Sequence, residues 1–286
     1  MMMDGADLIH SGFVTVVGRP NVGKSTLVNR IVGTKVSIVS DKPQTTRMQV
    51  RGVLNQPDAQ IVFVDTPGLH KPRTALGERT NATATDSIEG VDVVVFVVDA
   101  SGPISRGDNF VSELLPRDTV CVLNKIDGLS EEKLLMQLTR AAEWDFASYF
   151  PVSARTGKGV KGLVDHIVAL MPPGPAHYPM DSPSDTPESV WVAELVREQL
   201  LRMTHDELPH SITTRVTEWD WPRIRVEILV ERESQKGIAI GKKGAMLKLV
   251  GTAVRQKLPD GAFLELHVKV EKDWQRRGNS LDRLGF

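Results

Sequence analysis

The chain has 286 residues, 41% of them hydrophobic and 25% charged, which is typical of a globular protein long enough for two domains. Its net charge of -1 does not by itself indicate a nucleic-acid partner, and one cysteine, Cys121, excludes an internal disulfide framework or a thiolate metal cluster. Because residues 1–10 lack the basic start and apolar run of a signal peptide, and no run approaches the ~20 apolar residues of a membrane span, we expect a cytoplasmic protein.

After a tail at residues 1–10, short apolar runs alternate with helical patterns over residues 11–171. Strands are predicted at Phe13–Val17, Ile61–Val64, Val93–Val98, Val120–Leu123 and Tyr149–Val152. Several of these runs are almost continuously β-branched, as in parallel strands that are covered on both faces. Helices are predicted between them, including Glu131–Glu143 and Val160–Leu170. This alternation predicts an α/β domain with a doubly wound, mostly parallel sheet.

Residues 172–187 differ in character, because six prolines interrupt them and proline sustains neither a helix nor a strand ladder. We interpret this stretch as a linker. The pattern that follows predicts, in order, helix Glu188–Met203, strands Ser211–Val216 and Ile224–Val230, helices Gln235–Ile240 and Ala245–Leu258, and strand Phe263–Val270. The order α-β-β-α-α-β predicts a second, smaller α+β domain over residues 188–286.

The first chemical motif is Gly18-Arg19-Pro20-Asn21-Val22-Gly23-Lys24-Ser25, which matches the phosphate loop G-x-x-x-x-G-K-[ST] between a predicted strand and a predicted helix. The two glycines let the backbone curl so that its N–H groups face phosphates, and the following helix, which contains Thr26, points its positive end at them. Lys24 is expected to reach the β- and γ-phosphates and the Ser25 hydroxyl to bind Mg²⁺.

A second motif, Asn124-Lys125-Ile126-Asp127, follows a predicted strand. A carboxylate here can accept hydrogen bonds from N1–H and the amino group of guanine, and adenine offers neither donor. Sites built on such polar complementarity discriminate by about 10⁴ or more. The triplet Ser153-Ala154-Arg155 also follows a strand, and its backbone is expected to complete the guanine pocket.

A third motif, Asp65-Thr66-Pro67-Gly68, ends the strand Ile61–Val64. Asp65 is expected to act on Mg²⁺ through water, and the Gly68 N–H to sense the γ-phosphate. A polar stretch before it, residues 44–47, offers two hydroxyls, of which we favour Thr46 over Thr45 as the one that completes the Mg²⁺ shell only while GTP is bound. Such a segment acts as an order–disorder switch.

With these motifs in this order, the chain resembles the TRAFAC-class P-loop GTPases and, within them, the bacterial Era family. The resemblance extends through residues 43–47 and 65–72 to Leu208-Pro209-His210-Ser211 and Leu284-Gly285-Phe286. It implies a GTPase domain followed by a type II KH domain, with GTP or GDP and Mg²⁺ as ligands. It also implies binding to small-subunit (16S-type) ribosomal RNA near its 3′ end, and a role in maturation of that subunit.

The expected reaction is hydrolysis of GTP to GDP and phosphate. Ras-type enzymes orient the attacking water with a Gln directly after this third motif, and the chain has Leu69 there. In several relatives with this change an Asn of the phosphate loop, here Asn21, ligates a K⁺ ion; a plain structural role in the loop is the alternative. We expect slow intrinsic turnover with Lys24, Thr46 and Gly68 as catalytic groups, and we assign neither Arg19 nor Arg47 as a catalytic finger.

In the second domain Gly241-Lys242-Lys243-Gly244 lies between two predicted helices, as the G-x-x-G turn of a KH domain does. The glycines allow close approach to an RNA backbone, the lysines offer charge to phosphates, and Ile238 and Ile240 can line a groove for unstacked bases. Residues 234–286 carry 11 Lys and Arg against 5 Asp and Glu, a local net charge of +6 that suits phosphate contacts. The pair Arg276-Arg277 can equally be a solvated face.

Three tryptophans of this domain need separate interpretation. We expect Trp274 to pack under the last strand, and Trp219 and Trp221 to be structural residues of a turn. Two further functional hypotheses remain open on sequence alone. One is a membrane-linked signalling GTPase, peripheral at the inner face of the cell membrane, whose C-terminal domain binds protein. The other is a GTPase coupled to base modification. A monomer is the default expectation for the oligomeric state.

Overall fold

The computed structural model describes residues 8–204 and 208–286. The chain forms two compact units. The first consists of the chain through Ser37, Thr46–Pro72 and Arg79–Asp185; the second consists of Ile38–Thr45, Arg73–Glu78 and Thr186–Phe286. Most of the predicted tail, residues 1–7, lies outside the described residues, and the predicted domain boundaries stay predictions.

The sheet of the first unit has the strand order β2-β3-β1-β4-β5-β6, with β7 paired to the start of β1. Strands β3, β1, β4, β5 and β6 are parallel, and β2 and β7 pair antiparallel. The strands are β1 Ile9–Val17, β2 Val50–Gln56, β3 Ala59–Asp65, β4 Val93–Asp99, β5 Val120–Asn124, β6 Ser148–Pro151 and β7 Pro173–Gly174. The expected doubly wound, mostly parallel sheet is therefore confirmed.

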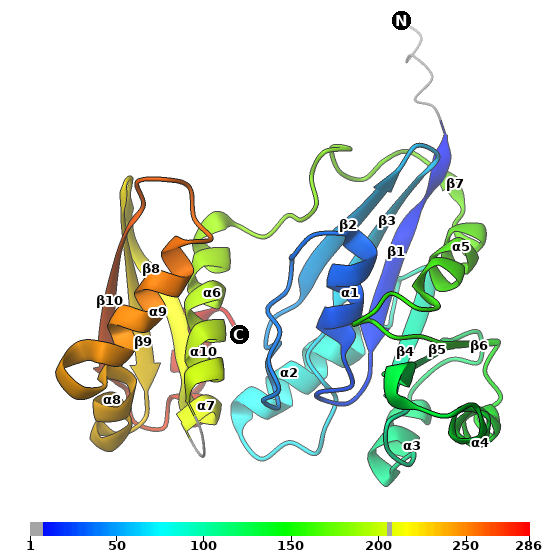
Figure 1. The fold of residues 1–286 in the computed structure, drawn as a ribbon, viewed down its shortest axis with the longest axis horizontal. Coiled ribbons are helices and arrows are strands. Elements are labelled where there is room, and N and C mark those ends of the chain that lie inside the picture. Colours follow the sequence, from blue (N-terminus) through cyan, green and yellow to red (C-terminus); the bar gives the residue numbers. More distant parts are fainter. Residues whose placement is uncertain (1–7, 205–207) are drawn as a thin grey trace, which may run out of the picture. The chain divides into compact units, whose positions relative to one another are not determined.

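Helices cover both faces of this sheet (Figure 1), which explains why its central strands are apolar along their whole length. One core layer joins α1 and α5 to the sheet, and the other joins α2, α3 and α4 to the opposite face. Helix α2 begins in the second unit and ends in the first. The helices are α1 Lys24–Val32, α2 Ala75–Asp86, α3 Arg106–Ser112, α4 Glu131–Ala142 and α5 Val160–Leu170.

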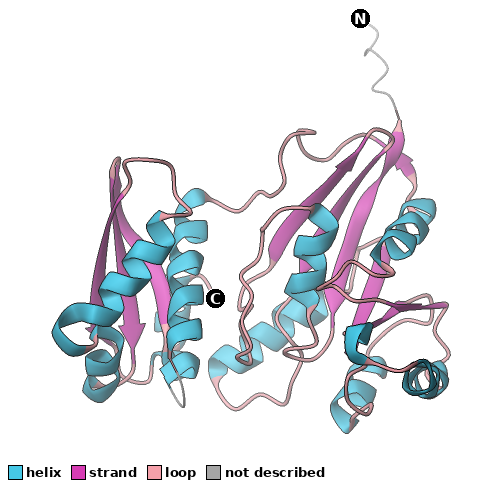
Figure 2. Ribbon diagram, in the orientation of Figure 1, coloured by secondary structure: helices cyan, strands magenta, loops and turns pink. Residues whose placement is uncertain are grey.

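The second unit has a three-stranded sheet, in the order β10-β9-β8, with β9 and β10 parallel and β8 and β9 antiparallel. Figure 2 shows α6, α8 and α9 on one face of it, where they close a single apolar core. Its elements are α6 Glu188–Met203, α7 Leu208–Ser211, β8 Thr213–Asp220, β9 Arg223–Val230, α8 Glu233–Ile240, α9 Ala245–Arg255, β10 Phe263–Val270 and α10 Gly278–Leu284. The predicted order α-β-β-α-α-β is confirmed.

Two local expectations were wrong. The proline-rich stretch does contribute to a ladder, because Pro173 and Gly174 pair with His10 and Ile9, and Val53 N–H donates to the Pro183 carbonyl at 2.8 Å. A proline carbonyl can accept a ladder bond although the residue has no N–H. Ser211 belongs to the short helix α7 rather than to a strand, and β8 begins at Thr213.

Candidate functional site

The predicted nucleotide motifs of the first unit come together at one edge of its sheet. The loop Gly18–Gly23 follows β1 and leads into α1, Asp65 ends β3, Asn124 ends β5, and Ser153 follows β6. In an open α/β sheet this is the edge where ligands bind, because the carboxyl ends of parallel strands and the amino ends of the following helices meet there.

Lys24 lies under the phosphate loop. Its ammonium donates hydrogen bonds to the carbonyls of Gly18 and Arg19, both at 3.0 Å, and its side chain is almost fully buried. Burial lowers the pKa of Lys24 to about 8, against the opposing attraction of the Asp65 carboxylate. The loop thus positions a cation beneath the space that phosphates would occupy. Burying this charge costs free energy, and a bound phosphate anion would offset that cost.

Two glycines of this loop are required by its geometry. Gly18 has φ of 147° and Gly23 has φ of 99°, both in the region that L side chains rarely adopt. A Cβ atom on Gly18 would lie 2.4 Å from the Val97 carbonyl oxygen, and one on Gly23 would lie 2.3 Å from Asn124 Nδ2. Any other residue would push the loop away from the sheet.

Asp65, Ser25 and Thr46 bring their oxygens together beside Lys24. The Ser25 and Thr46 hydroxyl oxygens are 2.9 Å apart, while the Thr45 hydroxyl instead donates to the Lys42 carbonyl at 2.7 Å. This placement favours Thr46 over Thr45, as the sequence suggested.

The Asp65 carboxylate is completely buried, and within residues 8–204 and 208–286 neither of its oxygens has a hydrogen-bond partner. Burial raises the pKa of Asp65, and Ser25 and Lys24 oppose that shift. A buried acceptor left without a donor is costly, and a set of hydroxyl and carboxylate oxygens suits a hard cation. These three residues therefore fit Mg²⁺, with the remaining ligands supplied by phosphate and water.

Gly68 lies against the phosphate loop, because a Cβ atom there would be 2.5 Å from the Pro20 backbone nitrogen. Its neighbours Thr66 and Pro67 complete the motif, and the Thr66 hydroxyl donates to the Val16 carbonyl at 2.8 Å. The next residue, Leu69, donates its N–H to the Gly18 carbonyl at 3.1 Å and buries its side chain in the core next to α3 and α4. Leu69 therefore cannot orient a water molecule.

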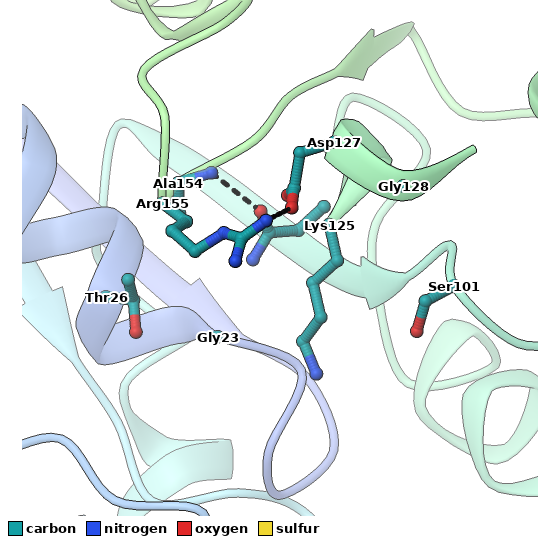
Figure 3. Close-up of a pocket in the computed structure, with 9 residues that line it drawn as sticks. Gly23, Thr26, Ser101, Lys125, Asp127, Gly128, Ala154 and Arg155 are labelled. Atoms are coloured by element: carbon teal, nitrogen blue, oxygen red, sulfur yellow. Dashed lines mark hydrogen bonds and ion pairs between the residues drawn. The ribbon is translucent and has the colours of Figure 1, made fainter. Parts of the chain in front are cut away.

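Most of the predicted base-binding residues, Asn124, Lys125, Asp127, Ala154 and Arg155, line a pocket of about 460 Å³ (Figure 3), and Ser153 is hydrogen-bonded to one of them, Asp127. Asn124 joins its two sides, since its amide donates to the Val22 carbonyl and accepts from the Ala154 N–H, both at 2.9 Å. Asp127 accepts a hydrogen bond from the Ser153 hydroxyl at 2.7 Å and pairs with Arg155. These bonds from Ser153 and then Arg155 hold the pKa of Asp127 below its ordinary value, so the carboxylate is ionised and ready to accept from a base.

Sequence reasoning missed two residues of this pocket, Ser101 and Gly128, and a third residue, Asp99, that holds one of its lining side chains. Ser101 and Gly128 line it, and Asp99 binds the Lys125 ammonium at 2.6 Å. Burial would raise the pKa of Asp99, but the bonds from Lys125 and Ser101 outweigh it and lower the value. The available signal was the position of Asp99 directly after the apolar strand Val93–Val98, at the same sheet edge as the other motifs.

Neither arginine near the phosphates is assigned a catalytic role. The Arg19 guanidinium in the phosphate loop donates to Asp108 at 2.7 Å, and Arg47, beside Thr46, is buried. The Asn21 carbonyl accepts from Lys125 at 2.7 Å, and Asn21 adopts φ of 66°. Its assignment as a K⁺ ligand stays a prediction. Thr26 lines the base pocket from the first turn of α1.

In the second unit the turn 241–244 joins α8 to α9, as predicted. Gly241 and Gly244 have φ of 74° and 78°, and a Cβ atom on Gly241 would lie 2.8 Å from Met246. The side chains of Lys242 and Lys243 are exposed at the surface. Nearby, Ile238 is 55% exposed and Ile240 is half-buried, so the apolar face beside the turn is open.

The three tryptophans of the second unit differ in burial. Trp274 is fully buried, donates its indole N–H to the Ser211 carbonyl at 2.9 Å and packs on Leu76 and Leu281, which confirms its packing role. Trp219 and Trp221 are 38% and 49% exposed, and their expected structural role in the turn stays a prediction. Their rings line a pocket that is described below.

Comparison with known families supports both predicted domains. A family model described as a 50S ribosome-binding GTPase matches residues 13–125, and a KH domain model matches residues 207–275. Within the described residues no helix is long and apolar enough to cross a membrane.

Curated relatives and solved structures are similar over almost the whole chain. The chain is 46% identical to the GTPase Era of Mycobacterium bovis, over 97% of this chain and 99% of that protein. It is 42% identical to the GTPase Era of Staphylococcus epidermidis, over 96% of this chain and 97% of that protein. It also resembles the structure of an Aquifex aeolicus Era variant bound to GDP·AlF₄⁻, with 37% identity, a TM-score of 0.92 and coverage of 97% and 99%. It resembles an Era structure in complex with MgGDPNP and nucleotides 1506–1542 of 16S ribosomal RNA as well, with 37% identity, a TM-score of 0.93 and coverage of 97% of this chain and 99% of that chain.

Proposed function

The chain belongs to the Era family of GTPases, and from this premise we propose that it is a GTP-hydrolysing switch that acts on the small ribosomal subunit. It binds GTP and GDP with Mg²⁺ in the first unit, and small-subunit ribosomal RNA near its 3′ end through the KH domain of the second. Its place in the cell is then the cytoplasm, where the small subunit matures.

The observation that carries the proposal is the double hydrogen bond of Asn124. Because one side chain holds both the phosphate loop and the loop at Ala154, the phosphate and base sites form one continuous binding surface. That surface ends at Asp127, whose ionised carboxylate matches the N1–H and amino donors of guanine. A guanine nucleotide satisfies both ends at once.

The same residues explain the expected chemistry. The loop amides and Lys24 would hold the β- and γ-phosphates, and Ser25, Thr46 and, through water, Asp65 would hold Mg²⁺, which would neutralise charge on the phosphates. The Gly68 N–H is positioned by its contact with Pro20 and can donate to the γ-phosphate. Positioning and charge are therefore supplied by the chain itself.

The attacking water has no side chain at position 69 to orient it, since Leu69 is buried in the core. We propose that the chain compensates with K⁺ bound near Asn21, and that without it turnover is slow. The exposed side chain of Asn21 lies in the phosphate loop, where such an ion would approach the phosphates. GTPase rates in KCl and NaCl test this, and equal rates in both salts would remove the K⁺ assignment.

The proposed gating rests on neighbouring residues. Thr46 places its hydroxyl at Ser25, while in the second unit Arg197 of α6 donates to the carbonyl of Thr45. Arg197 is itself almost completely buried. A change of Thr46 between the GTP and GDP states would therefore be transmitted directly to a residue that α6 holds.

RNA binding by the intact protein tests the whole proposal. The probe is an RNA with nucleotides 1506–1542 of 16S ribosomal RNA, titrated with a non-hydrolysable GTP analogue, with GDP and without nucleotide. We expect nucleotide to change the affinity by about 5- to 150-fold, as for an ordinary allosteric coupling, and the Lys242→Asp/Lys243→Asp variant to lose binding.

Each other result has a defined meaning. Binding that ignores nucleotide would remove the gating and retain the RNA site. Normal GTP binding with no RNA binding at modest salt would overturn the RNA function and favour a protein or membrane partner. A partner that is still pulled down after nuclease treatment would then identify that alternative.

A further inference from the structure

A second pocket, of about 390 Å³, lies within the second unit, away from the turn 241–244. Three elements build it: the first turns of α6, the β8–β9 hairpin and the chain just after α9. Its lining residues are Glu188, Trp191, Val192, Trp219, Trp221, Ile224, Lys257, Leu258 and Pro259. The volume lies in the usual range of about 300–1,000 Å³ for small-molecule sites.

The walls of this pocket are aromatic. Trp219 pairs in register with Ile224, which is buried in the core, so the Trp219 ring lies on the helix-facing side of the sheet. Trp191 approaches from α6, and Trp221 occupies the two-residue turn of the hairpin. Exposing two large indoles to water without a partner is unfavourable, and flat indole surfaces are those on which nucleobases stack.

The polar groups at this pocket are balanced. Lys257 offers an ammonium whose charge is already offset by the buried carboxylate of Glu198, 3.1 Å away, and Glu188 offers an exposed carboxylate. The ammonium of Lys257 disfavours a cationic ligand in this pocket, and the carboxylate of Glu188 disfavours an anionic one. A nucleobase is neutral, and cytosine and guanine present a donor and an acceptor on the same edge.

The pocket is also within reach of RNA bound at the turn 241–244. Helix α9 begins at that turn and Lys257 follows its end, so the two sites are separated by the 11 residues of the helix. At ~1.5 Å per residue this is about 17 Å, which a single strand covers in about five stacked nucleotides or fewer when it is extended. A KH turn clamps about four nucleotides, so a strand that leaves it can continue to the pocket.

We propose that the pocket formed by Trp191, Trp219 and Trp221 is a second RNA subsite, which binds one unstacked nucleobase of the strand held at the turn 241–244. This inference rests on the proposed RNA function of the second unit. It extends the RNA contact from the turn 241–244 to a base-stacking site at the other end of α9.

The test compares RNA length in the intact protein. The probes are the RNA with nucleotides 1506–1542 and fragments of it shortened stepwise from either end, against the wild type, Trp221→Ala, Trp219→Ala and Trp221→Phe. For RNA long enough to reach the pocket, each alanine variant is expected to bind about 5- to 150-fold more weakly, the loss of one stacked base. For the shortest RNA that still binds, the alanine variants and the wild type should bind with the same affinity. For the longer RNA, Trp221→Phe should recover most of the affinity that Trp221→Ala loses.

Two controls separate the subsite from folding and from the RNA function itself. Phe110 of the first unit is 49% exposed, the same exposed fraction as Trp221, and Phe110→Ala should not change RNA affinity. Unchanged unfolding temperatures show that the variants fold. If the alanine variants bind every RNA as the wild type does, while Lys242→Asp/Lys243→Asp loses binding, the subsite is overturned and the RNA function stands. If the wild type binds no RNA, the proposed function and with it the subsite are overturned.

Discussion

At the scale of single residues, the site is organised by side chains that bond to backbone. Asn124 holds two loops, Lys24 holds two carbonyls, and the buried Asp65 keeps both carboxylate oxygens available for a ligand. The motif spacing predicted each of these residues. Asp99 was not predicted, because its role depends on a Lys125 side chain that reaches it only once β4 and β5 lie side by side.

Asp127 sets the choice of base. With Asp127→Asn, the position would present an amide in place of an acceptor-only carboxylate, so preference should move from GTP towards xanthosine triphosphate. We expect GTP affinity to fall by at least about 10³-fold, given the discrimination of polar-complementary sites. Competition binding with the two nucleotides measures it, and an unchanged preference for GTP would remove Asp127 from base recognition.

Lys24 gives nucleotide binding a pH dependence. Its pKa of about 8 in the nucleotide-free protein means that phosphate must bind a lysine that is increasingly neutral above pH 8. GTP affinity should therefore fall about tenfold per pH unit above pH ~8, and binding at pH ~8.5 should take up protons. Calorimetry in two buffers of different ionisation enthalpy measures the uptake.

The stability of the nucleotide-free protein should move in the other direction. Between pH 8 and the ordinary lysine pKa of 10.5, the unfolded chain binds more protons at Lys24 than the folded chain does. The contribution of Lys24 to stability therefore rises with pH in that window. A Lys24→Arg variant, charged throughout, should show neither effect, and proton uptake that persists in it would assign the titration to another group.

At the scale of elements, the sequence predicted best where the hydrophobic period is regular. Helices Val160–Leu170 and Glu188–Met203 and strand Phe263–Val270 begin and end as predicted, because their apolar stripes are regular. Strand β2 and helix α2 were missed. Strand β2 is an edge strand with half-buried residues, and α2 is rich in Ala and Thr with little amphipathic contrast.

The loop at Gly68 depends on close contact between two elements. In Gly68→Ala the new Cβ would lie 2.5 Å from the Pro20 nitrogen and 2.7 Å from its Cα, and backbone atoms cannot yield as a side chain can. The loop should move away by about an ångström, which costs on the order of 10²-fold in rate, while GDP affinity stays within a few fold. GTPase assays and GDP titration measure this.

Gly162→Ala is the matched control for that variant. Beyond the local backbone of α5, no atom lies within 4 Å of the position that a Cβ atom would take at this glycine, so turnover should stay at the wild-type rate. A Gly68→Ala enzyme as active as the wild type would show that the approach to Pro20 is not needed for hydrolysis.

At the scale of the whole molecule, sequence order and spatial grouping differ. The sequence suggested one crossing between two domains, at the proline-rich stretch. The second compact unit also includes residues 38–45 and 73–78, which lie on either side of the Asp65–Gly68 motif, and the predicted domain boundaries stay predictions. Periodicity could not reveal this, because the polar segment 38–45 has no repeating pattern and is held by specific bonds to Arg197 and Glu198.

These bonds have a consequence for dividing the gene. A fragment of residues 186–286 would lack the Val39 N–H, which donates at 3.0 Å to the buried carboxylate of Glu198, and Leu76, which packs on Trp274. We expect its unfolding temperature to lie several degrees below that of the second unit in the intact chain, since a lost donor to a buried charge costs about 1–3 kcal/mol. Calorimetry of fragment and intact protein measures it, and equal temperatures would contradict it. The second unit is thus encoded in three separate stretches of the gene, and a module cut out at the prolines would leave part of its stabilising contacts behind.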